Sequence, residues 1–162
     1  MLAWVRGNAW RRWRNDLIPS RVRVHQETVE VRSRGRGLFD VTREVSAIVG
    51  RSGVHAGLCS VFVQHTSASL LIQENADPRV LADLGRWMSD LAPESRDWEH
   101  DDEGPDDMPA HARSAVTRTS ENLPVVGGEL GLGTWQALYL WEHRARAHTR
   151  RLVVTVIGNQ AR

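Results

Sequence analysis

Cysteine, lysine and long apolar runs are the scarcest features of this 162-residue sequence. Cys59 is the only cysteine, so no internal disulfide can form and a cysteine-rich metal site is excluded. No segment approaches the roughly 18 consecutive apolar residues of a membrane span. Arginines occur near the N-terminus, but no apolar block separates them from a cleavage site, as a secretory signal would require. We therefore expect a cytoplasmic protein with no membrane span.

The absence of lysine leaves arginine as the only strongly basic side chain. The 21 arginines are almost balanced by 20 Asp and Glu residues, and the formal net charge is +1. A general nucleic-acid binder usually carries a strong basic excess, so this balance argues against nucleic acid as a partner. The length fits one domain with a single core.

The first 20 residues differ in composition from the rest of the chain. Trp4, Trp10 and Trp13 lie among four arginines, and Pro19 ends the segment. Such a segment can form an amphipathic helix at a membrane surface or against an acidic partner. It can equally be an extension whose tryptophans pack on their own domain. We therefore divide the chain into an Arg- and Trp-rich extension, residues 1–20, and one domain, residues 21–162.

Apolar spacing and turn residues predict both strands and helices in the domain. Valines at two-residue spacing predict a strand pair or a bulged strand over 21–31, and Asp77-Pro78 predicts the start of a helix that runs to about residue 91. Two more helices are expected, one capped by Asp40 or Thr42 and stopped by Gly50 and Gly53, the other over 108–116. Further strands are expected at 58–64, 70–73, 123–126, 129–132, 135–142 and 152–157. Helices and strands do not alternate regularly, which favours a single-domain α+β fold with an antiparallel sheet.

Three of the seven histidines lie in unusually polar surroundings and are candidate metal ligands. His65 opens a Thr-Ser-Ala-Ser segment between two predicted strands. His100 and His111 flank the acidic part of residues 97–107, in which seven of the eleven residues are Asp or Glu. With one cysteine, a zinc site would need imidazole and carboxylate ligands, and three converging histidines would leave one coordination position open. The alternative for His65 is a loop histidine that hydrogen-bonds to nearby hydroxyls.

The acidic stretch can supply metal ligands of its own. Asp101, Glu103 and Asp106 are hard oxygen donors that would suit a magnesium ion bridged to a phosphate. Pro109 can begin a helix whose first N–H groups lie near His111. The alternative is a solvated surface segment, which is what charge runs usually are. The expected cofactor is a divalent metal, zinc or magnesium.

Two segments in the last third of the sequence can bind a ligand. The glycines before Trp135 allow close backbone approach at a strand entry, so Trp135 can stack on a ligand or belong to an aromatic core or subunit interface. Arg144 and Arg150 can hold a phosphate through paired guanidinium N–H groups. Equally, they can form a charged edge that keeps strands from pairing with other chains.

These stretches together resemble the YjbQ family (UPF0047), in its bacterial branch. The family signature is a Ser, spaced aliphatic residues and a Gly, followed by Gly-Thr-Trp-Gln, and it is matched at Ser120, Leu123, Val125, Gly128, Gly133, Thr134, Trp135, Gln136 and Leu138. Further segments fit the family pattern in the same order, namely His65–Ala68, Glu74-Asn75, His100–His111 and Glu142–Arg150. No family pattern transfers to residues 1–20.

The resemblance implies an antiparallel, sandwich-like α+β domain that assembles as a homotrimer. It also implies thiamine-phosphate synthase activity, in which hydroxymethylpyrimidine diphosphate is joined to thiazole phosphate and pyrophosphate is released. One alternative is metal-assisted hydrolysis of a small phosphorylated metabolite. Another is a non-enzymatic trimeric module that holds a metal or a metabolite.

The predicted site combines these motifs with the roles that such chemistry requires. The predicted metal ligands are His65, His100 and His111. The predicted catalytic residues are His65, Glu74, Glu103 and His111. The predicted substrate-binding residues are Ser67, Asn75, Trp135, Gln136, Arg144 and Arg150.

Overall fold

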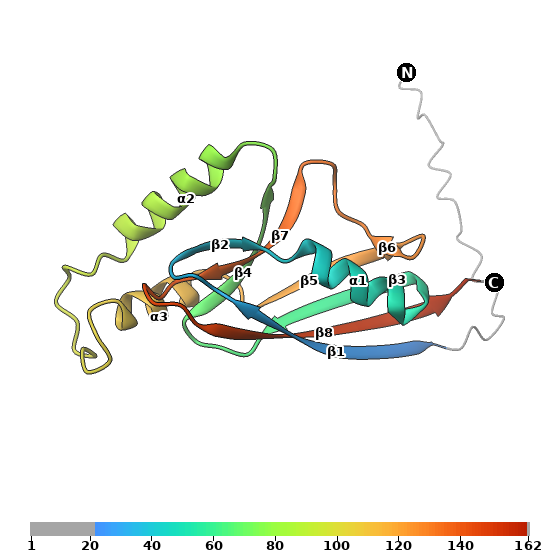
Figure 1. The fold of residues 1–162 in the computed structure, drawn as a ribbon, viewed down its shortest axis with the longest axis horizontal. Coiled ribbons are helices and arrows are strands. Elements are labelled where there is room, and N and C mark those ends of the chain that lie inside the picture. The colour runs from blue at the N-terminus through green and yellow to red at the C-terminus, as the bar shows by residue number, and fades with distance from the viewer. Residues whose placement is uncertain (1–21, 162) are drawn as a thin grey trace, which may run out of the picture.

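The computed structural model describes residues 22–161, which form eight strands and three helices (Figure 1). The strands are β1 (Arg23–Arg32), β2 (Gly37–Asp40), β3 (Val54–Val63), β4 (Ala68–Glu74), β5 (Ser120–Val126), β6 (Glu129–Leu130), β7 (Gln136–Glu142) and β8 (Thr149–Gln160). The helices are α1 (Thr42–Ser52), α2 (Pro78–Leu91) and α3 (Asp107–Ala115). The Arg- and Trp-rich extension predicted for residues 1–20 lies outside the described residues.

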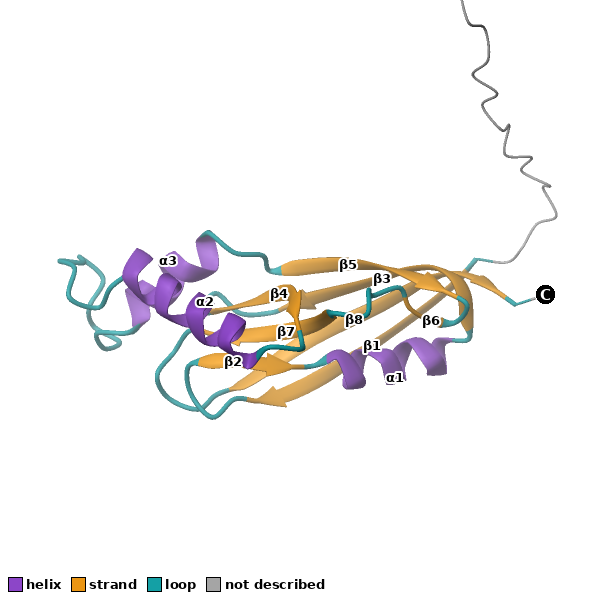
Figure 2. Cartoon of the chain, turned by 90° about the horizontal axis from the view of Figure 1, so that it is seen from above, coloured by secondary structure: helices purple, strands orange, loops and turns teal. Residues whose placement is uncertain are grey.

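The described strands pair antiparallel and form two sheets, which Figure 2 shows from above. The five-stranded sheet has the order β1-β8-β3-β5-β6, and the three-stranded sheet has the order β2-β7-β4. The segment that predicted a strand pair or a bulged strand is one continuous strand, β1, because every residue of it pairs in register with β8. The predicted single-domain α+β fold is confirmed.

The core lies between the five-stranded sheet, α1 and the three-stranded sheet. Alternate residues of the two central strands point into it, as the two-residue period of a strand requires. These inward residues are at most 1% exposed, and they are Cys59, Val61 and Val63 of β3 with Leu152, Val154 and Val156 of β8. The apolar face of α1 covers them with Val45, Ile48 and Val49.

Individual residues determine where α2 begins and where α1 ends. Asp77 Oδ1 accepts the backbone N–H of Arg79 at 2.9 Å, and Pro78 is the first residue of α2. This confirms the predicted helix start, in which a carboxylate satisfies a free N–H group. Gly53 follows α1 with φ 68, a left-handed conformation that glycine adopts without strain.

Helix α2 packs loosely beside the three-stranded sheet, at one end of the molecule (Figure 1). Met88 is the one buried residue of this helix, whereas Trp87 is 56% and Leu91 is 49% exposed. The apolar face that its sequence predicts is therefore largely uncovered. No helix within residues 22–161 combines the length and the apolar character needed to cross a membrane.

Candidate functional site

The predicted site residues fall into two groups at opposite ends of the three-stranded sheet. The first group comprises His65, Ser67, His100, Glu103, His111, Arg144 and Arg150. The second group comprises Glu74, Asn75, Trp135 and Gln136. Strand pairing places Ala68 opposite Glu142 at one end and Glu74 opposite Gln136 at the other. Six residue steps along a strand span about 20 Å, so one chain does not bring the two groups together.

Two side chains of the first group, those of His100 and His111, converge on a third, that of Asp107. Asp107 begins α3 and His111 lies one turn later, so both point to the same face of the helix. Asp107 Oδ2 lies 2.9 Å from His100 Nε2 and 3.3 Å from His111 Nε2. The Asp107 side chain is 3% exposed, while those of His100 and His111 are 44% and 34% exposed. The cluster therefore has a buried carboxylate and two histidines that solvent can reach.

The hydrogen bonding of His111 determines which ring nitrogen carries its proton. The carbonyl oxygen of Thr66 lies 3.2 Å from His111 Nδ1 and can only accept, so Nδ1 carries the proton. In the neutral ring, Nε2 then carries no proton and can only accept a hydrogen bond. It nevertheless faces the Asp107 carboxylate, which is also only a hydrogen-bond acceptor. Two acceptors at this distance need a cation, either a second ring proton or a metal ion. An N–H group donated to a backbone carbonyl is also the usual support of a metal-binding histidine.

Arg144 holds the carboxylates at the start of α3. Its guanidinium pairs with Asp107 Oδ1, and its Nε donates to Asp106 Oδ2 at 3.1 Å. Asp106 Oδ2 also accepts the backbone N–H of Ala145 at 2.7 Å. Burial alone would raise the pKa of Asp106, but the bonds from Ala145 and Arg144 outweigh it and hold that pKa below its ordinary value. Glu103 lies at the rim, 4.0 Å from Arg144 Nη1, with a 69% exposed side chain.

His65 and Arg150 belong to a separate buried network next to this cluster. Arg150 donates to Glu142 through Nε at 2.7 Å and Nη2 at 2.5 Å, and to Ser67 Oγ at 3.1 Å. His65 Nε2 accepts the backbone N–H of Arg151 at 3.0 Å, and Nδ1 lies 3.3 Å from Arg150 Nη1. Burial, followed by the charge of Arg150, lowers the pKa of His65. Both ring nitrogens of His65 thus face protein donors, and His65 is not one of the three converging side chains.

The second group of predicted residues is held by contacts at the start of β7. The backbone N–H of Asn75 donates to Trp135 O at 3.1 Å, and its side-chain amide donates to Gln136 O at 3.3 Å. Gln136 Oε1 accepts the N–H of Gly133 at 2.8 Å. Trp135 is 66% exposed and lines a cavity of about 410 Å³ together with Glu74 and Gln136. The stacking role of Trp135 stays a prediction.

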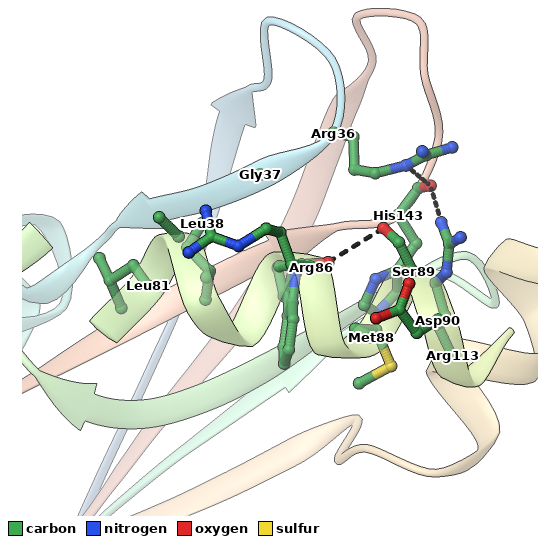
Figure 3. A pocket seen from close by; sticks show the side chains of 13 residues that line it. Arg36, Gly37, Leu38, Leu81, Arg86, Met88, Ser89, Asp90, Arg113 and His143 are labelled. Carbon is green, nitrogen blue, oxygen red and sulfur yellow. Dashed lines mark hydrogen bonds between the residues drawn. The ribbon is translucent and has the colours of Figure 1, made fainter. Parts of the chain in front are cut away.

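A larger cavity, of about 590 Å³, is lined by residues of α2, α3, β2 and β7 and by Arg36 and His143, which adjoin β2 and β7 (Figure 3). His143 and Arg113 are the most buried of its lining residues, at 0% and 1% exposure. His143 Nε2 lies 2.9 Å from Ser69 Oγ, and Arg113 Nη2 donates to Ala92 O at 2.8 Å. Within residues 22–161, His143 Nδ1 and Arg113 Nε have no hydrogen-bond partner. Burial, followed by the charge of Arg113, lowers the pKa of His143 to about 3, so the imidazole is neutral near pH 7.

Sequence reasoning misses two residues that organise these contacts. Asp107 is visible in the sequence only as part of the acidic stretch, although its spacing of four from His111 would have placed both on one helix face. Glu142 is fully buried against Arg150, eight positions away. It gives no local signal, because carboxylates are rarely buried and the pairing depends on two strands meeting.

Comparison with known proteins identifies relatives over most of the chain. The sequence profile of the UPF0047 protein YjbQ-like family matches residues 27–159. The chain is 55% identical over 137 residues to UPF0047 protein sll1880 of Synechocystis sp., which covers 84% of this chain and 93% of that protein. It is 40% identical over 135 residues to UPF0047 protein YjbQ of Escherichia coli O157:H7, which covers 83% of this chain and 98% of that one.

A solved structure has the same fold. It is the crystal structure of a YbjQ-like protein of unknown function from Sulfolobus solfataricus P2, with a TM-score of 0.79 and 27% identity. The match covers 85% of this chain and 99% of that one. Since that organism is an archaeon, the similarity is not confined to the bacterial branch that the motifs indicated.

Proposed function

The chain belongs to the UPF0047 family of YjbQ-like proteins, and we propose that it binds a divalent metal ion through His100, Asp107 and His111. The observation that carries this proposal is that His111 Nε2 lies 3.3 Å from the acceptor Asp107 Oδ2 while His111 Nδ1 donates to a backbone carbonyl. Two imidazoles and one carboxylate suit zinc better than magnesium, which prefers oxygen ligands. Zinc is therefore the first candidate.

The spacing of the donor atoms also fits zinc. Ligands at about 2.0–2.2 Å from a tetrahedral zinc ion lie about 3.3 Å from one another. Asp107 Oδ2 lies 2.9 and 3.3 Å from the two Nε2 atoms, and all three donor atoms lie within 4.8 Å. Three protein ligands leave one position for water or substrate, as in catalytic rather than structural zinc sites.

The surrounding residues support metal-assisted hydrolysis of a small phosphorylated metabolite. When bound, the metal would polarise a phosphoryl oxygen and activate a water molecule. Arg144 fixes the orientation of Asp107, and Thr66 O fixes the tautomer of His111. Glu103 lies at the exposed rim beside Arg144, and we assign it the role of general base. All of these groups come from one chain.

Thiamine-phosphate synthesis is the second candidate reaction, which the family resemblance implies. In this reaction a C–N bond forms at the thiazole nitrogen while the C–O bond to diphosphate breaks, so the site must stabilise the departing pyrophosphate and hold two rings. The exposed indole of Trp135 favours this reaction, because it offers a stacking surface beside a cavity. Trp135 lies at the other end of the sheet, roughly 20 Å along the strands. Synthesis therefore needs a neighbouring subunit to bring Trp135 to the metal cluster.

A homotrimer is the assembly that we propose, and the outer face of the five-stranded sheet supports an oligomer. Leu58, Phe62 and Ile157 on β3 and β8 are 41%, 45% and 40% exposed, and Leu58 lies directly opposite Ile157. Large apolar side chains exposed on one face of a sheet favour an interaction surface there. Sedimentation equilibrium of the full chain measures the assembly, and Phe62→Asp should shift it toward the monomer. A wild-type chain that sediments as a monomer would refute the trimer.

The metal content of protein purified without a metal-affinity tag tests the proposed site. Elemental analysis should find about one zinc ion per chain in the wild type. The His111→Ala and Asp107→Asn variants should lose it. The His55→Ala variant should keep it, since His55 is an exposed histidine outside the cluster. Equal metal content in the wild type and in His111→Ala would show that the cluster is not the site.

Complementation of a thiamine auxotroph separates the two candidate reactions. Growth that depends on the wild-type chain, is lost with His111→Ala and persists with Arg51→Ala would support synthesis. No complementation by a chain that holds stoichiometric metal would exclude synthesis. Release of phosphate from a panel of phosphorylated metabolites, sensitive to His111→Ala, would then support hydrolysis.

A further inference from the structure

A third cavity, of about 490 Å³, lies where α2 stands away from the three-stranded sheet. Its walls are mainly apolar and include Leu84, Trp87 and Leu91 of α2, Leu71 of β4, Val116 after α3 and Trp141 of β7. Its volume lies within the range of small-molecule pockets, about 300–1,000 Å³. The cavity is separate from the cluster of His100, Asp107 and His111, none of which lines it.

Among the described residues that line this cavity, Glu121 is the one acidic side chain and Arg118 the one basic side chain. Glu121 is 7% exposed and lies on the inward face of β5. Within residues 22–161, the nearest cation is Arg118, whose Nη1 lies 3.6 Å from Glu121 Oε2, beyond hydrogen-bond distance. The Arg118 side chain is 75% exposed and therefore largely hydrated. Burial raises the pKa of Glu121, and Arg118 only partly opposes this effect.

Comparison with Glu142 shows how unusual the surroundings of Glu121 are. Glu142 is also buried, but its carboxylate accepts hydrogen bonds from Ser33 Oγ, from the backbone N–H of Arg144 and from the Arg150 guanidinium. Burying a carboxylate without such donors is costly. Glu121 lines the cavity, so a ligand bound there can reach its carboxylate. A ligand can therefore supply the donors that the chain does not.

We propose that this cavity binds a small, flat, cationic nitrogen compound, such as an amidine or a protonated amino-heterocycle, whose N–H groups donate to Glu121. Paired N–H donors match a carboxylate and form charge-assisted hydrogen bonds, which are stronger than neutral ones. The indole of Trp87 lies in the lining and is 56% exposed, so a flat cationic ring can pack against it. The cavity combines mainly apolar walls with one carboxylate, and the one guanidinium in its lining, that of Arg118, is largely hydrated, so a flat ring whose N–H groups face Glu121 fits it.

Binding of three compounds of similar shape tests the proposal with the full chain. Benzamidine is the cationic probe, benzamide is its neutral counterpart and benzoate carries the opposite charge. Isothermal titration calorimetry, supported by ligand-observed NMR, should show that benzamidine binds with a dissociation constant of about 1 mM or lower. Benzamide should bind about tenfold more weakly or worse, because it lacks the charge-assisted bond. Benzoate should not bind.

Two variants and one control locate the binding. Glu121→Gln keeps the shape of the side chain and should weaken benzamidine about tenfold or more. Trp87→Ala should also weaken it, and this variant should fold because Trp87 is largely exposed. Glu129→Gln, an exposed glutamate of β6, should bind as the wild type does. The wild type and the three variants should hold the same amount of metal. A loss of benzamidine binding can then be distinguished from a loss of the metal site.

Several outcomes would overturn the proposal. It fails if benzamide binds as tightly as benzamidine, or if Glu121→Gln and Trp87→Ala both bind benzamidine as the wild type does. It also fails if no saturable binding of benzamidine occurs at millimolar concentration, as would be found if a second copy of the chain covered the cavity.

Discussion

The burial of His143 predicts a defined loss of stability in mild acid. Its ring is completely buried, and burial lowers its pKa from the ordinary 6.5 to about 3. The unfolded chain therefore binds a proton at this position below about pH 6.5, whereas the folded chain does not. The stabilising contribution is present above the unfolded pKa and is lost as the pH falls from 6.5 toward 3. Each pH unit in this window costs about 1.4 kcal/mol, so about 2 kcal/mol is lost at about pH 5.

The matched variant for this test is His143→Gln, which cannot be protonated in this range. Urea unfolding of the wild type should show about 2 kcal/mol more loss between about pH 7.5 and about pH 5 than unfolding of His143→Gln. His55→Gln, a change at an exposed histidine, should behave as the wild type does. A chelator in every sample keeps metal binding out of the comparison. The same pH-dependent loss in His143→Gln and in the wild type would show that the reasoning is wrong.

Two further pairs of substitutions test the packing by urea unfolding. Glu142→Gln weakens the fully buried ion pair with Arg150 and should lower the free energy of unfolding by about 3 kcal/mol or more. Glu30→Gln, in a pair whose side chains are 58% and 63% exposed, should change it by less than about 1 kcal/mol, and equal effects would contradict the burial argument. Gly57→Ala should destabilise the fold, because the added Cβ would lie 2.1 Å from a backbone oxygen of β8. Gly50→Ala in α1, with no atom within 4 Å, should instead stabilise it by about 0.5–1 kcal/mol, and a stabilising Gly57→Ala would refute the close approach of β3 and β8.

The parts of the fold that depend on neighbouring residues could be predicted from the sequence. The start of α2 depends on Asp77 and Pro78 alone, and both act within the first turn. The extent of β1 could not be predicted in the same way. It is a single strand because β8, more than about 100 positions away, pairs along its whole length. The exposed face of α2 also has a tertiary cause, since the helix stands over cavities rather than a packed sheet.

The candidate site was predictable in its residue types but not in its grouping. The polar histidines His100 and His111 stand out in the sequence, and they do converge. The third member is Asp107, and the structure places the ring nitrogens of His65 against donors from β8. Which loop reaches which helix depends on how the two sheets pack, and no local pattern records this. The assignment of His65 as a metal ligand stays a prediction.

The position of β8 has a consequence for folding during synthesis on the ribosome. Of the strands within residues 22–161, β8 comes last in the sequence and lies between β1 and β3, so β1, the first of them, pairs last. Among the described strands β1 pairs with β8 alone, so it has no strand partner until residues 149–160 have left the exit tunnel. We expect the five-stranded sheet to close only after residues 149–160 have emerged from the ribosome. Until then, the unpaired edges of β1 and β3 are the segments of the nascent chain most in need of protection by chaperones.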